Sequence, residues 1–395
     1  MDIFERSLER HRETHGKIEV RSRMRLETQE ELSIAYTPGV ARPCEVIAED
    51  PLAAWDLTWK GRCVAVVSDG SSVLGLGDIG PAAGLPVMEG KAALFREFGG
   101  VDSVPIVIDE HDPQKIVALV KAIAPTFGGI NLEDISAPRC FEIEDALQDV
   151  GIPVLHDDQH GTAIVLLAAV MNAAKATNRS LAQLDVVING AGAAGRAICN
   201  LLTCQGQGEW CIPVKSVTVC DSRGIIFPGR AGNNAIKEEI AKVTNPEGRR
   251  GTLHDAISGA HVFIGVSRGN LLTAEDISHM GEDPIVLAMA NPTPEIMPDE
   301  AIKGGAAVVG TGRSDFPNQV NNVLAFPGLF RGALEARALR FNEAMKFAAI
   351  FAIMESVPHP SPKMILPSPF DRSVAPRVAA KVAEAAKASG ACDPL

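Results

Sequence analysis

The sequence predicts an α/β protein in which two successive domains are each built on a parallel β-sheet. Two observations carry this prediction. Short apolar runs of strand length alternate with longer helical patterns along the chain, an order typical of β-α-β units. A glycine-rich turn at 190–195 also has the position of a strand-to-helix connection. At 395 residues the chain is long enough for two or three domains, each with its own core.

Bulk properties narrow the class of protein. Hydrophobic residues make up 46% and charged residues 22% of the chain, as in ordinary globular proteins. The net charge of -12 argues against nucleic-acid or membrane partners, since both need a basic face. The longest clean apolar run, 163–171, is too short to span a bilayer, and the charged N-terminal segment is not a signal peptide. The eight cysteines form no CxxC pair, so we expect free thiols and a cytoplasmic protein.

The first domain is expected to cover residues 1–159. Its apolar runs at 63–67, 104–108 and 129–135 predict buried strands, and each ends at polar or turn-forming residues. The segment 113–124 alternates as an amphipathic helix between two of these strands. The order implies a parallel sheet.

The second domain is expected to cover residues 160–395 and to begin with a helix at about 161–178. Its predicted strands are 185–189, 216–220, 262–266, 285–290 and 307–310. Two alanine-rich helices follow at about 331–355 and 373–389, joined by a proline-rich connection.

The pattern Gly190-x-Gly192-x-x-Gly195 between a strand and a helix indicates a Rossmann-type dinucleotide-binding turn. Gly190 permits the tight turn, Gly192 lets the backbone approach a pyrophosphate, and Gly195 allows close helix packing. Ala193 and Ala194 complete the turn, and the helix that follows points its N-terminus at the phosphates. The bland alternative, a turn that only relieves crowding, does not account for the ordered strand, turn, helix and strand.

Asp221 ends the next predicted strand, where a carboxylate can accept hydrogen bonds from the adenosine ribose. An acid there favours NAD, because it would repel the 2′-phosphate of NADP. Ser222 and Arg223 follow at once and could bind that phosphate, so NADP stays open.

Carboxylates gather directly after two apolar runs, at Glu133 and Asp134 and again at Asp157 and Asp158. Adjacent acids repel one another unless a cation lies among them, and oxygen ligands suit Mg²⁺ or Mn²⁺. The alternative is a solvated turn or a helix N-cap. His156 and His160 also raise a zinc site, but the HExxH pattern of zinc proteases is absent, and hydrogen-bonded histidines explain them better.

Two further residues are candidates for acid and base chemistry. Tyr36 is the only tyrosine, in a turn-rich segment, and could equally be a packing residue. Lys91 lies near a predicted helix start. A surface lysine is the ordinary interpretation, but a lysine near a helix N-terminus and a metal has a lowered pKa, as a general base requires.

Taken together, these motifs resemble the short, prokaryotic-type malic enzymes over essentially the whole chain. The resemblance rests on segments that occur in the family's order, namely 36–41, 68–70, 74–80, 89–91, 133–138, 156–162, 190–195, 291–295 and 318–322. It implies oxidation of L-malate by NAD or NADP, followed by decarboxylation to pyruvate on Mg²⁺ or Mn²⁺. It also implies a homodimer or higher homo-oligomer.

The resemblance assigns roles to single residues. Tyr36 looks like the general acid, Lys91 like the general base, and Asp157 like the residue that holds Lys91. The implied metal ligands are Glu133, Asp134 and Asp158.

Asparagines are the implied substrate ligands. Asn291 and Asn321 look like donors to the malate carboxylate, Asn291 also lying near the cofactor, and Asn322 is a further candidate. Large eukaryotic-type members carry an arginine before the segment 74–80 that clamps this carboxylate, and this chain has none there. Whether Tyr36 and Lys91 of one site come from one subunit stays open.

Two rival functions are weighed against this one. A non-decarboxylating dehydrogenase, such as an amino-acid dehydrogenase, needs no metal, so the acidic set speaks against it. A non-catalytic NAD-binding protein has no reason to keep Tyr36, Lys91 and that acidic set.

Overall fold

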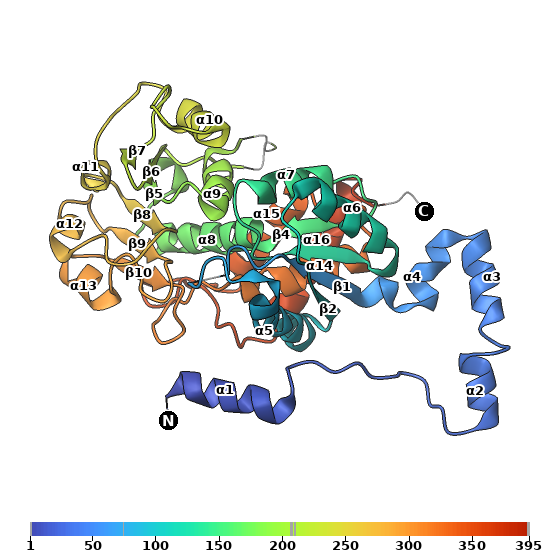
Figure 1. Cartoon of the computed structure of the whole chain (residues 1–395). Coiled ribbons are helices and arrows are strands. Elements are labelled where there is room, and N and C mark those ends of the chain that lie inside the picture. The colour runs from blue at the N-terminus through green and yellow to red at the C-terminus, as the bar shows by residue number, and fades with distance from the viewer. Residues whose placement is uncertain (1, 74, 206–207, 209–210, 393–395) are drawn as a thin grey trace.

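The computed structural model describes residues 2–73, 75–205, 208 and 211–392. It confirms the α/β class: two sheets lie side by side, each flanked by helices, and α8 (Asp157–Ala176) runs between them (Figure 1). In these ranges, no helix combines the length and apolarity needed to cross a bilayer.

The first sheet has four parallel strands among the described residues, in the order β2-β1-β3-β4. Alternate residues of the central strand face opposite sides, as the pleat requires. Val64 and Val66 pack with Met88 of α5, whereas Ala65 packs with Ile116 of α6. The elements of this domain are β1 (Cys63–Ser68), α5 (Gly80–Leu94), a π-helical turn (Phe95–Gly99), β2 (Asp102–Val107), α6 (Pro113–Ile123), β3 (Gly129–Leu132), α7 (Arg139–Ala146) and β4 (Val154–His156).

The second sheet has the order β10-β9-β8-β5-β6-β7 and is parallel except for the short edge strand β7. The order changes direction at β5, whose neighbours are β6 and β8, and ligands of open α/β sheets bind at such a point. The elements are β5 (Asp185–Asn189), α9 (Ala193–Thr203), β6 (Ser216–Asp221), β7 (Gly224–Ile225), α10 (Ala235–Thr244), α11 (Leu253–Ile257), β8 (Val262–Gly265), α12 (Ala274–Ser278), β9 (Ile285–Ala288), α13 (Pro298–Lys303) and β10 (Val308–Thr311).

Three C-terminal helices return to the first sheet: α14 (Phe326–Glu335), α15 (Glu343–Glu355) and α16 (Val374–Ala388). Phe95 of the π-helical turn packs edge-on against Phe326 and Phe330 of α14, with ring centroids 4.7 and 5.4 Å apart. The tail therefore joins the core of the N-terminal half, and one buried cluster extends through both sheets.

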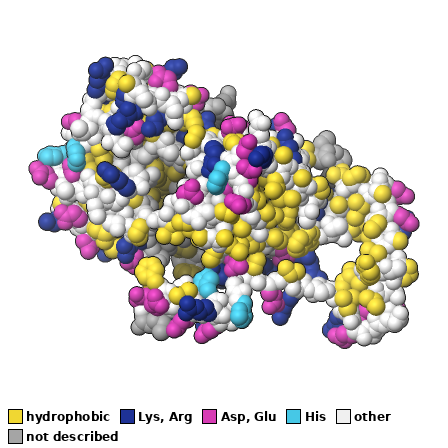
Figure 2. Space-filling model, viewed as in Figure 1, with side chains coloured by type: hydrophobic (Ala, Val, Ile, Leu, Met, Phe, Trp, Pro, Cys, Tyr) yellow, Lys and Arg dark blue, Asp and Glu magenta, His cyan; other side chains and the backbone are white. Residues whose placement is uncertain are grey.

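An N-terminal arm extends from the body of the molecule (Figure 1). It contains α1 (Ile3–Thr14), α2 (Gln29–Ala35), α3 (Ala41–Glu49) and α4 (Ala54–Leu57), and none of the four helices has a buried residue among those described. Leu32, Ile34, Leu52 and Leu57 are exposed, and Figure 2 shows hydrophobic side chains gathered over this arm.

Two predictions about local structure are wrong. The helix expected at 331–355 is two helices, because Arg337 takes a left-handed conformation (φ 50°) and Asn342 caps a new helix start. The cysteines are not all free, since Cys204 and Cys211 form a disulfide; the other six are unpaired thiols.

Candidate active site

The centre of the candidate site is a buried ion-pair cluster around Lys91. This lysine is only 6% exposed, and its Nζ donates to Glu133 Oε1 at 2.9 Å and to the Asp157 carboxylate. The ammonium also lies 4.0 Å from the centroid of the Phe326 ring. The end of α5, the loop after β3 and the start of α8 therefore meet at one edge of the first sheet.

Lys91 differs from the expectation in two respects. It lies in the last turn of α5, not near a helix start, and a helix C-terminus favours a cation. Burial alone would lower the pKa of Lys91, but the Asp157 and Glu133 carboxylates outweigh burial and raise that pKa. The expected lowered pKa is therefore wrong for the site as it stands.

The three proposed metal ligands lie in one acidic cluster. The backbone N–H of Asp134 donates to Asp158 Oδ2 at 2.8 Å, and Asn131 Nδ2 donates to Glu133 Oε2 at 2.8 Å. Burial, followed by the charges of Asp158 and Glu133, raises the pKa of Asp134 to about 9. Burial and neighbouring charge likewise raise the pKa of Asp158 to about 6. The cluster thus concentrates negative charge that Lys91 alone does not neutralise.

This donor set has the chemistry of a divalent-cation site. Its groups are carboxylate oxygens, and Asp134 Oδ2 is buried without a hydrogen-bond partner. In the part of the chain that the structure describes, no three His, Cys, Asp or Glu side chains are arranged around a common point as metal ligands. The acids fit the cation by chemistry, while their side chains do not have the arrangement of a closed site.

Glu144 is a functional candidate that the sequence analysis missed. Its buried carboxylate accepts from the backbone N–H of His156 and from Gln159 Nε2, both at 2.9 Å, and it pairs with His160 at 3.1 Å. A side chain of α7 thus anchors the start of α8, which carries Asp157. The available signal was an acid at a position of α7 where its apolar stripe faces the core.

The glycine-rich turn has the geometry expected of a phosphate-binding turn. Gly190 has φ 128°, and a Cβ there would lie 2.6 Å from the carbonyl oxygen of Val266. A Cβ at Gly195 would overlap the carbonyl oxygen of Gly190, so α9 can pack this closely only with glycine. Gly192 is exposed and has open space around its missing Cβ. Ala193 begins α9, whose first turn lacks a side-chain cap, so its N–H groups are free to meet an anion.

Two cavities adjoin this turn. One of about 600 Å³ is lined by Gly190, Asp221, Arg223 and Arg268 among others. A second of about 290 Å³ lies between Gly192 and Pro138, in the loop that follows the acidic cluster. The cofactor turn and the Lys91 cluster therefore border the same junction between the two sheets.

Asp221 is not available as expected. Its side chain is 8% exposed, and its oxygens accept from Arg230, from Lys237 Nζ at 2.8 Å and from the Arg223 backbone N–H at 2.9 Å. Burial raises the pKa of Asp221, but Arg230 and Lys237 outweigh burial and hold that pKa at about 2. Its charge is compensated, so the argument that it repels a 2′-phosphate does not hold.

The three asparagines make different contacts in the structure. Asn322 Nδ2 donates to the Asp157 carboxylate, so the residue treated as a further candidate contacts the cluster directly. Asn321 uses its Oδ1 to accept from Val323 N at 3.0 Å, as the cap of a short 3₁₀ helix. Asn291 precedes a cis proline, and its Nδ2 donates to its own neighbour Met289 at 3.3 Å.

Tyr36 is not brought to Lys91 within this chain. It follows α2 on the extended arm and is 69% exposed. A phenol, a lysine and the acids were expected to converge, and the single chain assembles only the lysine and the acids.

Arg139 is a second group that the sequence analysis missed. Its Nη2 donates to Asp69 Oδ2 and to Ser136 Oγ, both at 3.0 Å, and Nη1 donates to the carbonyl of His111 at 3.0 Å. It therefore ties the loop after β3 to the loop after β1. Its charge is paired, so it does not stand free as the missing carboxylate clamp.

Fold and site together define a two-domain, dinucleotide-binding oxidoreductase with a lysine and acids at the domain junction. Residues 15–148 match the family described as "Malic enzyme, N-terminal domain", and residues 159–387 match "Malic enzyme, NAD binding domain". The chain belongs to the malic enzyme family.

Individual relatives agree over nearly the full length. The chain is 53% identical to the bifunctional malic/malolactic enzyme of Bacillus subtilis, over 99% of this chain and 94% of that one. It is 53% identical to the NAD-dependent malic enzyme of Geobacillus stearothermophilus, over 95% and 77% respectively. The crystal structure of the malic enzyme of Pyrococcus horikoshii superimposes with a TM-score of 0.93 at 46% identity, covering 100% of this chain and 93% of that one.

Proposed function

We propose that this chain oxidises L-malate with NAD(P)⁺ and decarboxylates the product to pyruvate and CO₂, with Mg²⁺ or Mn²⁺ bound. The observation that carries the proposal is the buried contact of Lys91 with Asp157 and Glu133, beside surplus carboxylates and a glycine-rich turn. A lysine held by acids at a cofactor junction suits removal of a hydroxyl proton during hydride transfer.

In the proposed reaction, neutral Lys91 accepts the proton of the C2 hydroxyl while the C2 hydride passes to the nicotinamide. Asp157 orients the lysine, and Asn322 donates to the same carboxylate oxygen of Asp157. Loss of the C4 carboxylate as CO₂ leaves its electron pair on an enolate, which Tyr36 protonates at C3. Asn291 and Asn321 are the proposed donors to the malate carboxylate.

Glu133, Asp134 and Asp158 are the residues that would hold the cation. When bound, a divalent cation supplies polarisation of the C2 oxygen, which stabilises the developing enolate. Neutralising these acids also removes charge that keeps the proton on Lys91, so the pKa of Lys91 falls toward the range that a base requires.

A homodimer completes this site in the proposal. The arm that carries Tyr36 is exposed, and its apolar residues Leu32, Ile34 and Leu57 lack a covering surface in the described chain. A second copy of the chain supplies such a surface, and Tyr36 of each arm then serves the Lys91 cluster of the other copy.

For the cofactor, we propose that both NAD and NADP are accepted. Gly190, Gly192, Ala193, Ala194 and Gly195 hold the pyrophosphate. Arg230 and Lys237 neutralise the acid that would otherwise reject a 2′-phosphate, so the weight given to NAD by Asp221 alone is removed.

We also propose a cytoplasmic location and a functional division into residues 1–159 and 160–395. Six unpaired thiols support a reducing compartment, whereas the Cys204–Cys211 disulfide is unusual for a protein in such a compartment. The boundary would fall at the start of α8, beside Asp158.

The test is NAD(P)H formation from L-malate and Mn²⁺ by the purified protein, with pyruvate and oxaloacetate measured separately. We expect pyruvate equal to the reduced cofactor, and loss of both signals in Lys91→Ala. Retained cofactor binding by this variant, followed by nicotinamide fluorescence, controls for folding. Oxaloacetate without pyruvate would indicate the non-decarboxylating rival, and no turnover in the wild type would favour the non-catalytic one.

A further inference from the structure

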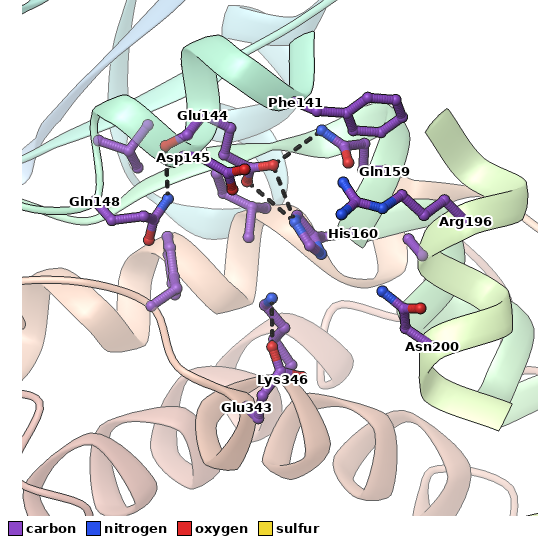
Figure 3. Close-up of a pocket in the computed structure, with 14 residues that line it drawn as sticks. Phe141, Glu144, Asp145, Gln148, Gln159, His160, Arg196, Asn200, Glu343 and Lys346 are labelled. Carbon is purple, nitrogen blue, oxygen red and sulfur yellow. Dashed lines mark hydrogen bonds and ion pairs between the residues drawn. The ribbon is translucent and has the colours of Figure 1, made fainter. Parts of the chain in front are cut away.

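A cavity of about 260 Å³ lies behind the candidate active site, among α7, α8, α9 and α15 (Figure 3). At roughly 30 Å³ for each water, it has room for a small organic molecule. Its lining includes apolar side chains such as Phe141 and Phe341 together with both acids and bases. None of the residues given catalytic, metal or cofactor roles above lines it.

Opposite charges face the cavity without pairing directly. Arg196 of α9 points into it, and Asp145 of α7 lies on the opposite wall (Figure 3). Burial raises the pKa of Asp145 and the Arg196 charge opposes that rise, yet within the described structure the two side chains form no ion pair. The Arg196 guanidinium instead stacks on Phe141, with Cζ 4.7 Å from the ring centroid, and reaches Glu239 only at 3.8 Å.

Two more polar groups point into the same space. Asn200 lies one turn after Arg196 on α9, and its amide has no hydrogen-bond partner in the described ranges. Lys346 of α15 approaches from below, 12% exposed, with Nζ 2.8 Å from Glu343 Oε1. The cavity thus offers donors on the α9 and α15 side and a carboxylate on the α7 side.

We propose that this cavity binds a free α-amino acid, whose carboxylate is held by Arg196, Asn200 and Lys346 and whose ammonium is held by Asp145. A simple carboxylate fits less well, because it would leave Asp145 without a cationic partner and add negative charge beside the Lys346–Glu343 pair. A simple amine would meet Arg196 and Lys346. A zwitterion satisfies both walls without changing the net charge.

Such a ligand would bridge the two halves of the molecule. Asp145 belongs to α7 of the first domain, and Arg196 belongs to the helix that starts at the cofactor turn. A bound ligand would favour the conformation in which α7 and α9 are as far apart as in this structure. The ligand therefore acts as an effector that binds away from malate and is coupled to the cofactor through α9.

The experiment is a thermal-shift and calorimetric screen of the full chain with each proteinogenic amino acid singly. For the best binder, the matched acid that lacks the amino group and the matched amine that lacks the carboxylate are tested as well. We expect the amino acid to raise the melting temperature and the two analogues to leave it unchanged. If the deaminated acid bound as well as the amino acid, or if no amino acid bound, the proposal would be overturned.

Variants place the binding in this cavity. Asp145→Asn and Lys346→Met should each weaken binding at least about tenfold, since each removes a charged partner. Asp149→Asn and Lys381→Met, exposed positions outside the cavity, are the matched controls. Affinity unchanged in both cavity variants would move the ligand elsewhere and refute the assignment. None of these readouts requires malate turnover, so the result stands apart from the test of the reaction.

Discussion

Glu144 Oε1 accepts a hydrogen bond from the backbone N–H of His156 at 2.9 Å, at the point where β4 passes into α8. Asp157 and Asp158 are the next two residues and begin α8. The Glu144 carboxylate therefore holds in place the backbone from which both acids project. The contact joins residues 12 apart in sequence and is fully buried.

Glu144→Gln should lower both stability and turnover. Burial would raise the pKa of Glu144, but His160 and nearby cations outweigh it and hold that pKa at about 2, against 4.5 unperturbed. The ionised form then contributes on the order of 3 kcal/mol, present above about pH 4.5 and lost as the pH falls toward 2. Denaturant unfolding at several pH values should show the gap between wild type and variant closing below pH ~4.5. Glu142→Gln, exposed on the same helix, is the control; an equal loss there would contradict the role of Glu144.

Asp134→Asn should have opposite effects without and with metal. Burial and neighbouring acids raise the pKa of Asp134 to about 9, so its ionised form costs stability near neutral pH. Without metal the variant should melt at or above the wild-type temperature. Added Mn²⁺ should raise the wild-type melting temperature by a few degrees and leave the variant unchanged. An equal Mn²⁺ shift in both proteins would exclude Asp134 as a ligand; exposed Asp109→Asn is the control.

Mixing two variants that are each defective in pyruvate formation tests whether the arm completes a partner's site. Tyr36→Phe should still oxidise malate but form little pyruvate. Lys91→Ala should be inactive in both steps. If Tyr36 serves the other copy, exchanged dimers of the two variants contain one intact site, and about a quarter of wild-type pyruvate formation returns. No recovery after verified subunit exchange would show that both residues act within one chain, or that Tyr36 has no such role.

Arg230→Met should shift cofactor choice toward NAD. Removing the guanidinium frees charge on Asp221, which then opposes a 2′-phosphate. The ratio of kcat/KM for NADP to that for NAD should fall by about tenfold, equivalent to roughly 1.4 kcal/mol. Initial rates with the two cofactors at fixed Mn²⁺ and malate give this ratio. Lys242→Met, an exposed position on α10, is the matched control.

The parts of this protein that the sequence predicted are those governed by short-range pattern. The apolar run at 185–189 and the following glycines define β5 and its turn, because strand length and glycine spacing are local properties. The acids after β3 and at the start of α8 were also found, because parallel strands end at one edge of a sheet.

The features that the sequence did not predict depend on contacts between side chains that come together only in the folded chain. Asp221 gains Arg230 and Lys237 from a loop and a helix whose paths the sequence does not specify. Lys91 was expected at the start of a helix but lies in the last turn of α5. It is therefore near the negative end of the helix dipole and not the positive end. Tyr36 was expected in the site, but it lies on the extended arm and is 69% exposed.

The continuous apolar cluster that joins both sheets has a consequence for how the molecule comes apart. Phe326 and Phe330 pack against the first sheet, although they follow the entire second one in sequence. If one half unfolded, it would expose part of the other half's hydrophobic core to water. The two halves are therefore expected to unfold in one cooperative transition. A lesion in either half of this cluster is therefore expected to lower the stability of the whole body of the protein.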